Sequence, residues 1–201
     1  MFFTLPSTLP ESREIWTVEC LDSSTKRSEI SRADRDPTGD SIVLDESITT
    51  GGEFYPQTAQ SYPHDYLGGT GGSIGWARPA GAGAAISSPD RKVIVLESDG
   101  SGMYMPQSLW TYAREQLDIV VLIFSNRKYQ ILRSEMADVG VPDFGLKAQS
   151  RLDLDNPHID WVSLSQGLGV PAAQVETTED LDRAFRTALA DPGPQLIEVL
   201  V

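Results

Sequence analysis

The two stretches KVIVLE at residues 92–97 and IVVLIF at residues 119–124 decide the fold of this chain. Both are continuous runs of β-branched and other apolar residues, which is typical of strands covered on both faces in a parallel sheet. The segment between them, residues 107–117, is predicted to be a helix. The three segments together therefore predict a βαβ unit.

Further strands and helices are expected on either side of this unit. The short apolar run at residues 41–45 suits a buried strand, and residues 195–201 are expected to form the last strand. Residues 74–86 are mostly small, so a helix there could pack very close to the sheet. Three later helices are predicted at residues 129–137, 160–168 and 179–189, the last with Thr177 or Thr178 as its cap.

Strands that alternate with helices predict a three-layer α/β/α domain, doubly wound around a mainly parallel sheet. In such a domain, ligands bind in the crevice at the carboxyl ends of the strands. We expect the domain to span residues 41–201. Residues 1–40 are polar and charged and lack the period of a strand or a helix, so a linker or a poorly ordered arm is expected there.

The composition limits the possible functions. The formal net charge of −13 argues against a general affinity for nucleic acid or anionic membranes. Cys20 is the single cysteine, so no intramolecular disulfide can form. Residues 1–10 lack the features of a signal peptide or a membrane span, and a cytoplasmic location is expected. Because only His64 and His158 could join that cysteine in a zinc site, a bound metal would need oxygen ligands.

Polar residues follow both central strands of the predicted unit. SDGSG occupies residues 98–102 and SNRKY occupies residues 125–129. Because both loops fall on the same edge of the sheet, Asp99 and Asn126 should lie close together. An acid and an amide oxygen beside glycines could hold Mg²⁺ and a diphosphate. Taken alone, Asp-Gly-Ser after a strand is more often a turn with an Asp-capped helix, so that alternative stays open.

The order of these segments resembles that of thiamine diphosphate (ThDP) enzymes. Asp-Gly-Ser, a βαβ crossover, and then Asn126 and Tyr129 look like the ThDP motif of the acetolactate synthase and benzoylformate decarboxylase superfamily. Residues 71–79 resemble the family's loop over the aminopyrimidine ring, and residues 126–133 resemble the acetolactate synthase-like branch. The resemblance covers about residues 41–201 and implies the ThDP-binding fold of the C-terminal, diphosphate-binding domain.

The resemblance also implies which residues would hold the cofactor. Mg²⁺ would be bound by Asp99, the side chain of Asn126 and the backbone carbonyl of Lys128. The Gly72 carbonyl would accept a hydrogen bond from the 4′-amino group, and Ile74 would bend the cofactor into its reactive shape. The full set of expected cofactor contacts is Ser47, Thr49, Gly72, Ile74, Asp99, Gly100, Ser101, Asn126, Tyr129, Gln130 and Ile131.

Two positions depart from the family's usual pattern. Ser98 stands where the family usually has glycine, and Ser125 stands where it usually has asparagine. Neither change removes a metal-binding atom. Ser98 adds a Cβ where the backbone approaches the cofactor closely, which favours weaker binding.

The resemblance further implies that catalysis needs a second domain, because no residue of this chain is expected to be catalytic by itself. In the family, a glutamate on a separate pyrimidine-binding domain activates the thiazolium ring. We therefore expect a homo- or hetero-oligomer, or a longer parent enzyme, that supplies this domain. Met103 and Tyr104 are expected to contribute to the surface of association, and Trp110 is expected to pack in the core. For Trp76 both the surface and core packing stay open.

Three functions remain open at this stage. The first is a ThDP- and Mg²⁺-binding part of an acetolactate synthase-like transferase or lyase, which acts on 2-oxo acids by decarboxylation and carbon–carbon bond formation. The second is a subunit of a 2-oxo acid decarboxylase of the benzoylformate or sulfopyruvate type. The third is a non-catalytic remnant or assembly module.

Overall fold

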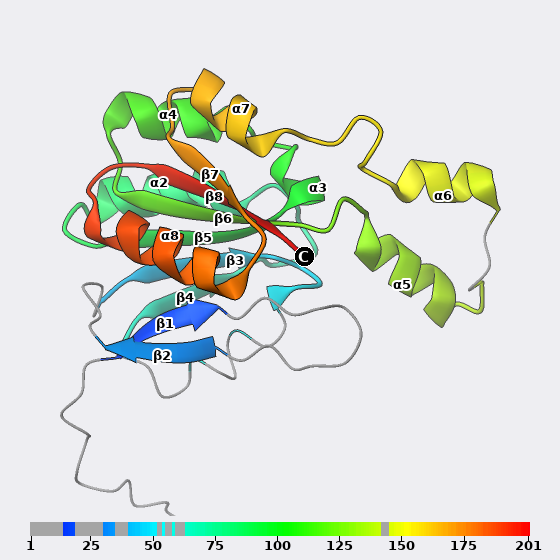
Figure 1. Cartoon of the computed structure of the whole chain (residues 1–201), viewed down its shortest axis with the longest axis horizontal. Helices are drawn as coiled ribbons and strands as arrows, with labels where there is room; N and C mark the ends of the chain where they lie inside the picture. Colours follow the sequence, from blue (N-terminus) through cyan, green and yellow to red (C-terminus); the bar gives the residue numbers. More distant parts are fainter. Residues whose placement is uncertain are drawn as a thin grey trace, which may run out of the picture.

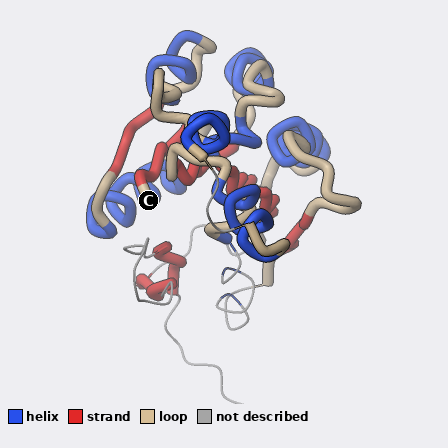
Figure 2. Tube along the Cα trace, turned by 90° about the vertical axis from the view of Figure 1, so that its right-hand side faces the viewer, coloured by secondary structure: helices blue, strands red, loops and turns tan. Residues whose placement is uncertain are grey.

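The chain forms a parallel sheet between two layers of helices (Figure 1). The structure, a computed structural model, describes residues 14–18, 30–34, 40–51, 54, 58, 63–141 and 145–201. The sheet has six strands in the order β4-β3-β5-β6-β8-β7, and every neighbouring pair is parallel. The end view in Figure 2 shows helices on both sides of the strands. The predicted α/β/α fold with a mainly parallel sheet is confirmed.

The four central strands are those predicted from apolar runs. β5 (Val93–Ser98) and β6 (Ile119–Ser125) pair in the middle, and every residue of β6 is buried. β3 (Ile42–Glu46) lies beside β5, and β8 (Gln195–Leu200) lies beside β6. Burial on both faces explains why these strands have no polar alternation.

The two edge strands were not predicted. β4 (Asp65–Gly68) and β7 (Ala172–Val175) have four residues each and are mostly exposed. Because exposed edge strands need no apolar run, the patterns that mark buried strands are missing there. The helix α6 (Leu146–Leu152) was also not predicted, and it has no buried residue. Figure 1 shows α6 and α5 (Gln130–Asp138) extending from the body of the domain.

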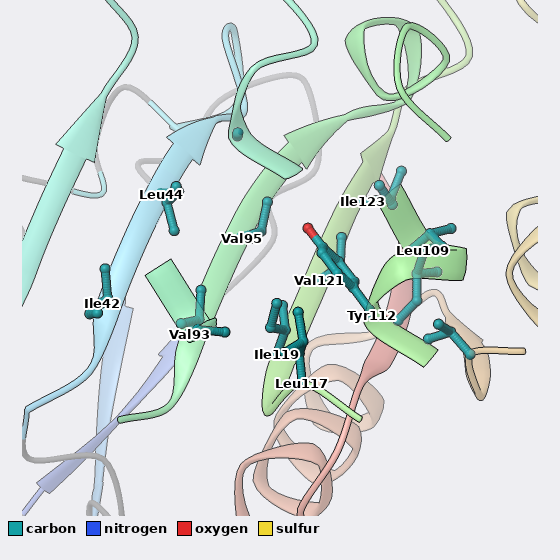
Figure 3. Packing of buried hydrophobic residues seen from close by; sticks show 14 of the residues in the cluster. Ile42, Leu44, Val93, Val95, Leu109, Tyr112, Leu117, Ile119, Val121 and Ile123 are labelled. Atoms are coloured by element: carbon teal, nitrogen blue, oxygen red, sulfur yellow. The ribbon is translucent and has the colours of Figure 1, made fainter. Parts of the chain in front are cut away.

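One face of the sheet is covered by α2 (Ala77–Ser87), α4 (Ser108–Glu115) and α7 (Trp161–Gly167). Leu109 and Tyr112 of α4 pack beside side chains of β6, and the same cluster continues across β5 to Ile42 and Leu44 of β3 (Figure 3). These helices correspond to segments predicted from the sequence, including the small-residue helix.

Trp110 of α4 lies on the solvent side of the helix, and the expectation that it packs in the core was wrong. Its side chain is 51% exposed, and the guanidinium carbon of Arg114 lies 5.4 Å from the centre of its ring. Leu109 and Tyr112 face the sheet instead, so the neighbouring position faces outward.

The other face is covered by α8 (Thr178–Ala190), whose residues Leu181, Phe185 and Ala188 are buried against the sheet. Thr177 caps this helix, because its hydroxyl oxygen accepts a hydrogen bond from the Asp180 N–H at 3.2 Å. Of the two threonines that the sequence offered as a cap, the structure therefore selects Thr177.

The cap predicts a difference between two adjacent substitutions. Thr177→Ala should lower the free energy of unfolding by about 1 kcal/mol, because it leaves a helix N–H without its acceptor. Thr178→Ala, the matched control, should change that free energy by less than about 0.5 kcal/mol. Urea denaturation of both variants measures the difference, and equal losses would show that Thr177 is not the cap.

The segment before residue 40 is described only in part. β1 (Glu14–Val18) and β2 (Ile30–Asp34) pair in an antiparallel sheet of two strands. The rest of the predicted N-terminal arm lies outside the described residues. Among the helices in the described ranges, none combines the length and the apolar character needed to cross a bilayer.

Candidate functional site

The loops after β5 and β6 meet at the carboxyl edge of the sheet. β5 continues directly into the short helix α3 (Asp99–Gly102), and β6 ends at Ser125. Asp99 Oδ2 accepts a hydrogen bond from the Arg127 N–H at 2.6 Å. The structure thus brings together the two loops that the sequence predicted to meet.

Asp99 is held firmly in this position. Asp99 is only 1% exposed, and its Oδ1 accepts a hydrogen bond from the Gly100 N–H at 2.8 Å. Burial raises the pKa of Asp99, and hydrogen bonds from Arg127, Gly100 and Ser125 oppose this rise. A carboxylate has about four lone-pair sites, so these bonds leave it capacity to bind a cation.

Asn126 and Lys128 lie in the second loop. Asn126 Oδ1 accepts a hydrogen bond from the Lys128 N–H at 2.9 Å. Lys128 and Asp153 form an isolated antiparallel bridge, in which the hydrogen bonds join the Arg127 carbonyl to the Leu154 N–H and the Tyr129 N–H to the Leu152 carbonyl. In a pair of this kind, the N–H and C=O of Lys128 point away from the strand opposite. The Lys128 carbonyl therefore lies on the same side as the Asn126 side chain.

Gly100 and Ser101 lie between these residues and the core. A Cβ on Gly100 would lie 2.7 Å from Cε1 of Tyr129, so the packing of the tyrosine ring requires glycine. The hydroxyl of Ser101 donates a hydrogen bond to Glu97 and lies 2.7 Å from the hydroxyl oxygen of Ser98. The Tyr129 ring therefore positions Gly100, and the Glu97 carboxylate positions Ser101.

A pocket of about 450 Å³ opens beside this edge, between the end of β3 and the glycine-rich loop, which comprises residues 69–75. It brings together Gly72, Ile74 and Ile131, three of the residues predicted to contact a cofactor. Gly72 has a φ of +66°, a conformation that glycine adopts without strain. The complete lining is Asp45, Glu46, Ile48, Gly51, Tyr66, Gly72, Ser73, Ile74, Trp76 and Ile131.

Ser47, Thr49 and Gln130 are not among the residues that line this pocket. The N–H and hydroxyl of Ser47 both donate to Asp45 Oδ1, and Thr49 is exposed in the turn that follows β3. Gln130 is exposed at the start of α5, where its side-chain nitrogen lies 3.5 Å from the Ser134 hydroxyl. A role of these three residues in cofactor binding stays a prediction.

The sequence patterns missed two acidic residues at the end of β3. The buried carboxylate of Glu46 accepts hydrogen bonds from the N–H groups of Gly75 and Ala77, the latter at 2.8 Å. These bonds fix the end of the glycine-rich loop against the start of α2. Asp45 accepts a hydrogen bond from the Tyr66 hydroxyl, and burial together with this bond raises the pKa of Tyr66. The sequence does contain a signal for this pair, because two adjacent acidic residues end a strand that is otherwise apolar.

A buried ion pair beneath the site was also missed. Arg78 Nε lies 3.6 Å from Glu97 Oε2, and both side chains are fully buried. Burial raises the pKa of Glu97 to about 8, with a further contribution from the Glu46 carboxylate and an opposing one from Ser101 and Arg78. Burial also lowers the pKa of Arg78.

The ligand set available at this edge consists of oxygen atoms from different residue types. Within the described ranges, no group of three or more His, Cys, Asp or Glu side chains could hold a metal ion. Asp99, Asn126 and the Lys128 carbonyl offer one carboxylate, one amide and one backbone oxygen. Mg²⁺ is the cation that such a set suits, because it commonly takes few protein ligands and completes its shell with phosphate and water oxygens.

Comparisons with known proteins agree with the family resemblance of the sequence. Residues 51–199 match a family profile described as "Thiamine pyrophosphate enzyme, C-terminal TPP binding domain". A putative acetolactate synthase large subunit of Mycobacterium tuberculosis is 48% identical over 161 residues, which cover 80% of this chain and 31% of that protein. Benzoylformate decarboxylase of Pseudomonas aeruginosa is 34% identical over 160 residues, which cover 80% of this chain and 29% of that protein.

Solved structures give the same result. A thiamine diphosphate-dependent 4-hydroxybenzoylformate decarboxylase of Rhodococcus jostii RHA1 superposes with a TM-score of 0.72 at 36% identity. The superposition covers 81% of this chain and 29% of that chain. The chain thus spans less than a third of the length of these relatives.

Proposed function

Since the chain belongs to the thiamine pyrophosphate enzyme family and carries its C-terminal TPP-binding domain, we propose that it binds the cofactor diphosphate and Mg²⁺ at the carboxyl edge of its sheet. The observation that supports this proposal most directly is the hydrogen bond from the Arg127 N–H to Asp99 Oδ2, which joins the two loops. The domain that carries the site spans residues 41–201 in this proposal.

Asp99, Asn126 and the Lys128 carbonyl would hold the metal ion. The carboxylate is fixed by backbone N–H groups of both loops, and the Lys128 carbonyl lies on the side of Asn126. Gly100 and Ser101 begin a short helix beside the carboxylate, and the N-terminal end of a helix favours an anion. The Gly100 N–H already donates to Asp99 Oδ1, so the Ser101 N–H is the one offered to the diphosphate. The residues present therefore fit a magnesium diphosphate.

The pocket beside this edge would take the organic part of the cofactor. When bound, thiamine diphosphate supplies a carbanion equivalent for chemistry on 2-oxo acids. Ile74 and Ile131 are among its lining residues, so apolar side chains would orient the cofactor and exclude water from it. The Gly72 carbonyl would accept a hydrogen bond from the aminopyrimidine ring.

We propose that the chain is the diphosphate-binding part of an acetolactate synthase-like enzyme, which decarboxylates 2-oxo acids and forms a carbon–carbon bond. The similarity to the putative acetolactate synthase large subunit supports this assignment. A pyrimidine-binding domain with the activating glutamate would complete the site, either on a partner subunit or in another part of a longer polypeptide. Exposed apolar side chains at the same edge, 45% for Ile74, 44% for Met103 and 58% for Tyr104, support such a contact.

A second candidate is a 2-oxo acid decarboxylase subunit. The similarity to two benzoylformate-type decarboxylases supports it, one by sequence and one by structure. The two candidates share the cofactor site and differ in whether a second carbonyl compound or a proton captures the intermediate.

Product analysis separates these candidates. We expect no CO₂ release from pyruvate by the chain alone, and release with formation of acetolactate after addition of the pyrimidine-binding domain of the mycobacterial relative. Release of CO₂ without acetolactate would favour the decarboxylase. Binding of thiamine diphosphate without any turnover in the mixture would favour a non-catalytic module, and turnover by the chain alone would contradict the need for a second domain.

A further inference from the structure

The buried Arg78–Glu97 pair lies between the two segments that the proposed function assigns to the cofactor. Arg78 is in the first turn of α2, which directly follows the glycine-rich loop. Glu97 precedes Ser98 at the end of β5, where the chain enters residues 98–102, here called the diphosphate loop. The distance of 3.6 Å between Nε and Oε2 therefore connects the two segments through the interior.

Each end of this connection is attached to one loop. Glu97 Oε1 accepts hydrogen bonds from the Ser101 hydroxyl and from the Ser98 N–H, the latter at 3.2 Å. At the other end, the Glu46 carboxylate binds the N–H of Ala77, the residue before Arg78. Polar contacts therefore hold each end of the connection, and the backbone from Ala77 to Arg78 joins them.

Trp161 packs against both Arg78 and the end of α3. The guanidinium carbon of Arg78 lies 5.4 Å from the centre of the Trp161 ring, and both residues are fully buried. A Cβ on Gly102 would lie 2.8 Å from Cη2 of the same ring, so α3 also packs on the tryptophan. The ring therefore contacts both the ion pair and the diphosphate loop.

Stability alone does not account for this pair. Within the described part of the chain, none of the three side-chain nitrogens of Arg78 has a hydrogen-bond partner, and neither has Glu97 Oε2. Removing two charges from water costs more than their attraction returns unless further hydrogen bonds satisfy them, and apolar replacements of such pairs are often equally stable or more stable. A function for the pair beyond holding the fold would explain its presence.

We propose that Arg78 and Glu97 are positioning residues, which hold Ser101 and α3 in the orientation that receives the diphosphate and connect them to the glycine-rich loop. Glu97 gives the Ser101 hydroxyl a fixed acceptor, and Arg78 fixes the Glu97 carboxylate. The proposal rests on the proposed function, because it concerns affinity for the same cofactor. It adds two residues that do not themselves contact the cofactor.

The test replaces both charges together, so that no unpaired charge is left in the core. We expect the double variant Arg78→Leu with Glu97→Leu to unfold cooperatively, at a temperature no lower than that of the parent chain. Its dissociation constant for thiamine diphosphate at saturating Mg²⁺ should rise by about tenfold, because the Ser101 hydroxyl loses the acceptor that fixes its orientation. Calorimetry measures the binding and circular dichroism measures the unfolding of the cofactor-free chain.

A second ion pair of the chain provides the control. Asp182 and Arg186 pair on α8, with Nε and Oδ1 2.8 Å apart, and they belong to neither loop. Replacing both with alanine should leave the dissociation constant within about twofold of the parent value. The comparison separates the position of the pair from the loss of any ion pair.

A third arm tests whether Glu97 acts through Ser101. Ser101→Ala should weaken binding by itself, and adding it to the double variant should change the dissociation constant by less than about twofold, because the two changes remove one contact. If the double variant does not fold, Arg78→Lys and Arg78→Met replace it. The lysine variant should keep the affinity within about threefold, and the methionine variant should weaken it more.

Two failures are distinguishable. A folded double variant that binds as tightly as the parent would overturn the positioning role and leave the proposed function intact. The positioning role would also be overturned if Ser101→Ala weakened binding as much in the double variant as in the parent chain. Equal affinities of the Arg78→Lys and Arg78→Met variants would overturn it too. Absence of binding by the parent chain would overturn the proposed function and the positioning role together.

Discussion

Asp99→Asn should raise the dissociation constant for thiamine diphosphate in the presence of Mg²⁺ by about 100-fold or more. Loss of an outer contact already costs about 10- to 100-fold in metal affinity, and this substitution removes the charge of a direct ligand. Asparagine keeps the size of the side chain and an acceptor for the Arg127 N–H that joins the loops, but its NH2 group replaces the oxygen that accepts from the Gly100 N–H. An unchanged unfolding temperature of the variant shows that the loss arises at the site and not from unfolding.

Asp90→Asn provides the matched control, because Asp90 is an exposed aspartate in the turn before β5, at the opposite end of that strand. We expect this variant to bind as the parent chain does. Calorimetric titration of both variants with and without a chelator gives the metal-dependent part of the affinity. Parent-like binding by the Asp99 variant would remove Asp99 from the site.

Gly81→Ala should lower the free energy of unfolding by about 1–3 kcal/mol, which is typical of overpacking in a tight core. A Cβ at this position would lie 2.9 Å from Cγ2 of Val95 and 3.3 Å from the hydroxyl oxygen of Tyr112. Both neighbours are buried in the layer between α2 and the sheet, so the helix would have to move outward. Such a shift would also displace the glycine-rich loop that precedes the helix.

Gly83 of the same helix gives the control for this substitution. It is exposed, and a Cβ there would have no heavy atom within 4 Å. Gly83→Ala should therefore raise the free energy of unfolding by about 0.5–1 kcal/mol, because alanine loses less backbone entropy in a helix. Opposite signs for the two glycines in chemical denaturation confirm the close approach of α2, whereas equal signs would contradict it.

The sequence predicted the centre of the fold because burial on both faces leaves an unambiguous pattern. β3, β5, β6 and β8 follow from apolar runs, and Gly81 follows from the small residues around it. The edge strands β4 and β7 could not be found in this way, since their exposed side chains follow no rule of burial. Trp110 was placed wrongly because the amphipathic pattern of α4 does not by itself decide which side faces the sheet.

The site was predictable to the extent that it depends on the ends of parallel strands. The contact between the Asp99 and Arg127 loops follows from adjacency of β5 and β6, which the sequence indicated. The Arg78–Glu97 pair could not be predicted, because a charged residue in a small-residue helix is ordinarily solvated. Its burial depends on the register of α2 against β5, and only the three-dimensional structure shows that register.

The most direct test of the account is the titration of the unmodified chain with thiamine diphosphate, in the presence and absence of Mg²⁺, with thiamine as the comparison ligand. We predict saturable binding of thiamine diphosphate that requires Mg²⁺, and much weaker binding of thiamine, because the diphosphate and the metal ion supply the contacts with the loops at Asp99 and Asn126. No binding of thiamine diphosphate at millimolar concentration, or equal affinity for thiamine, would contradict the assignment of this edge of the sheet as a magnesium diphosphate site.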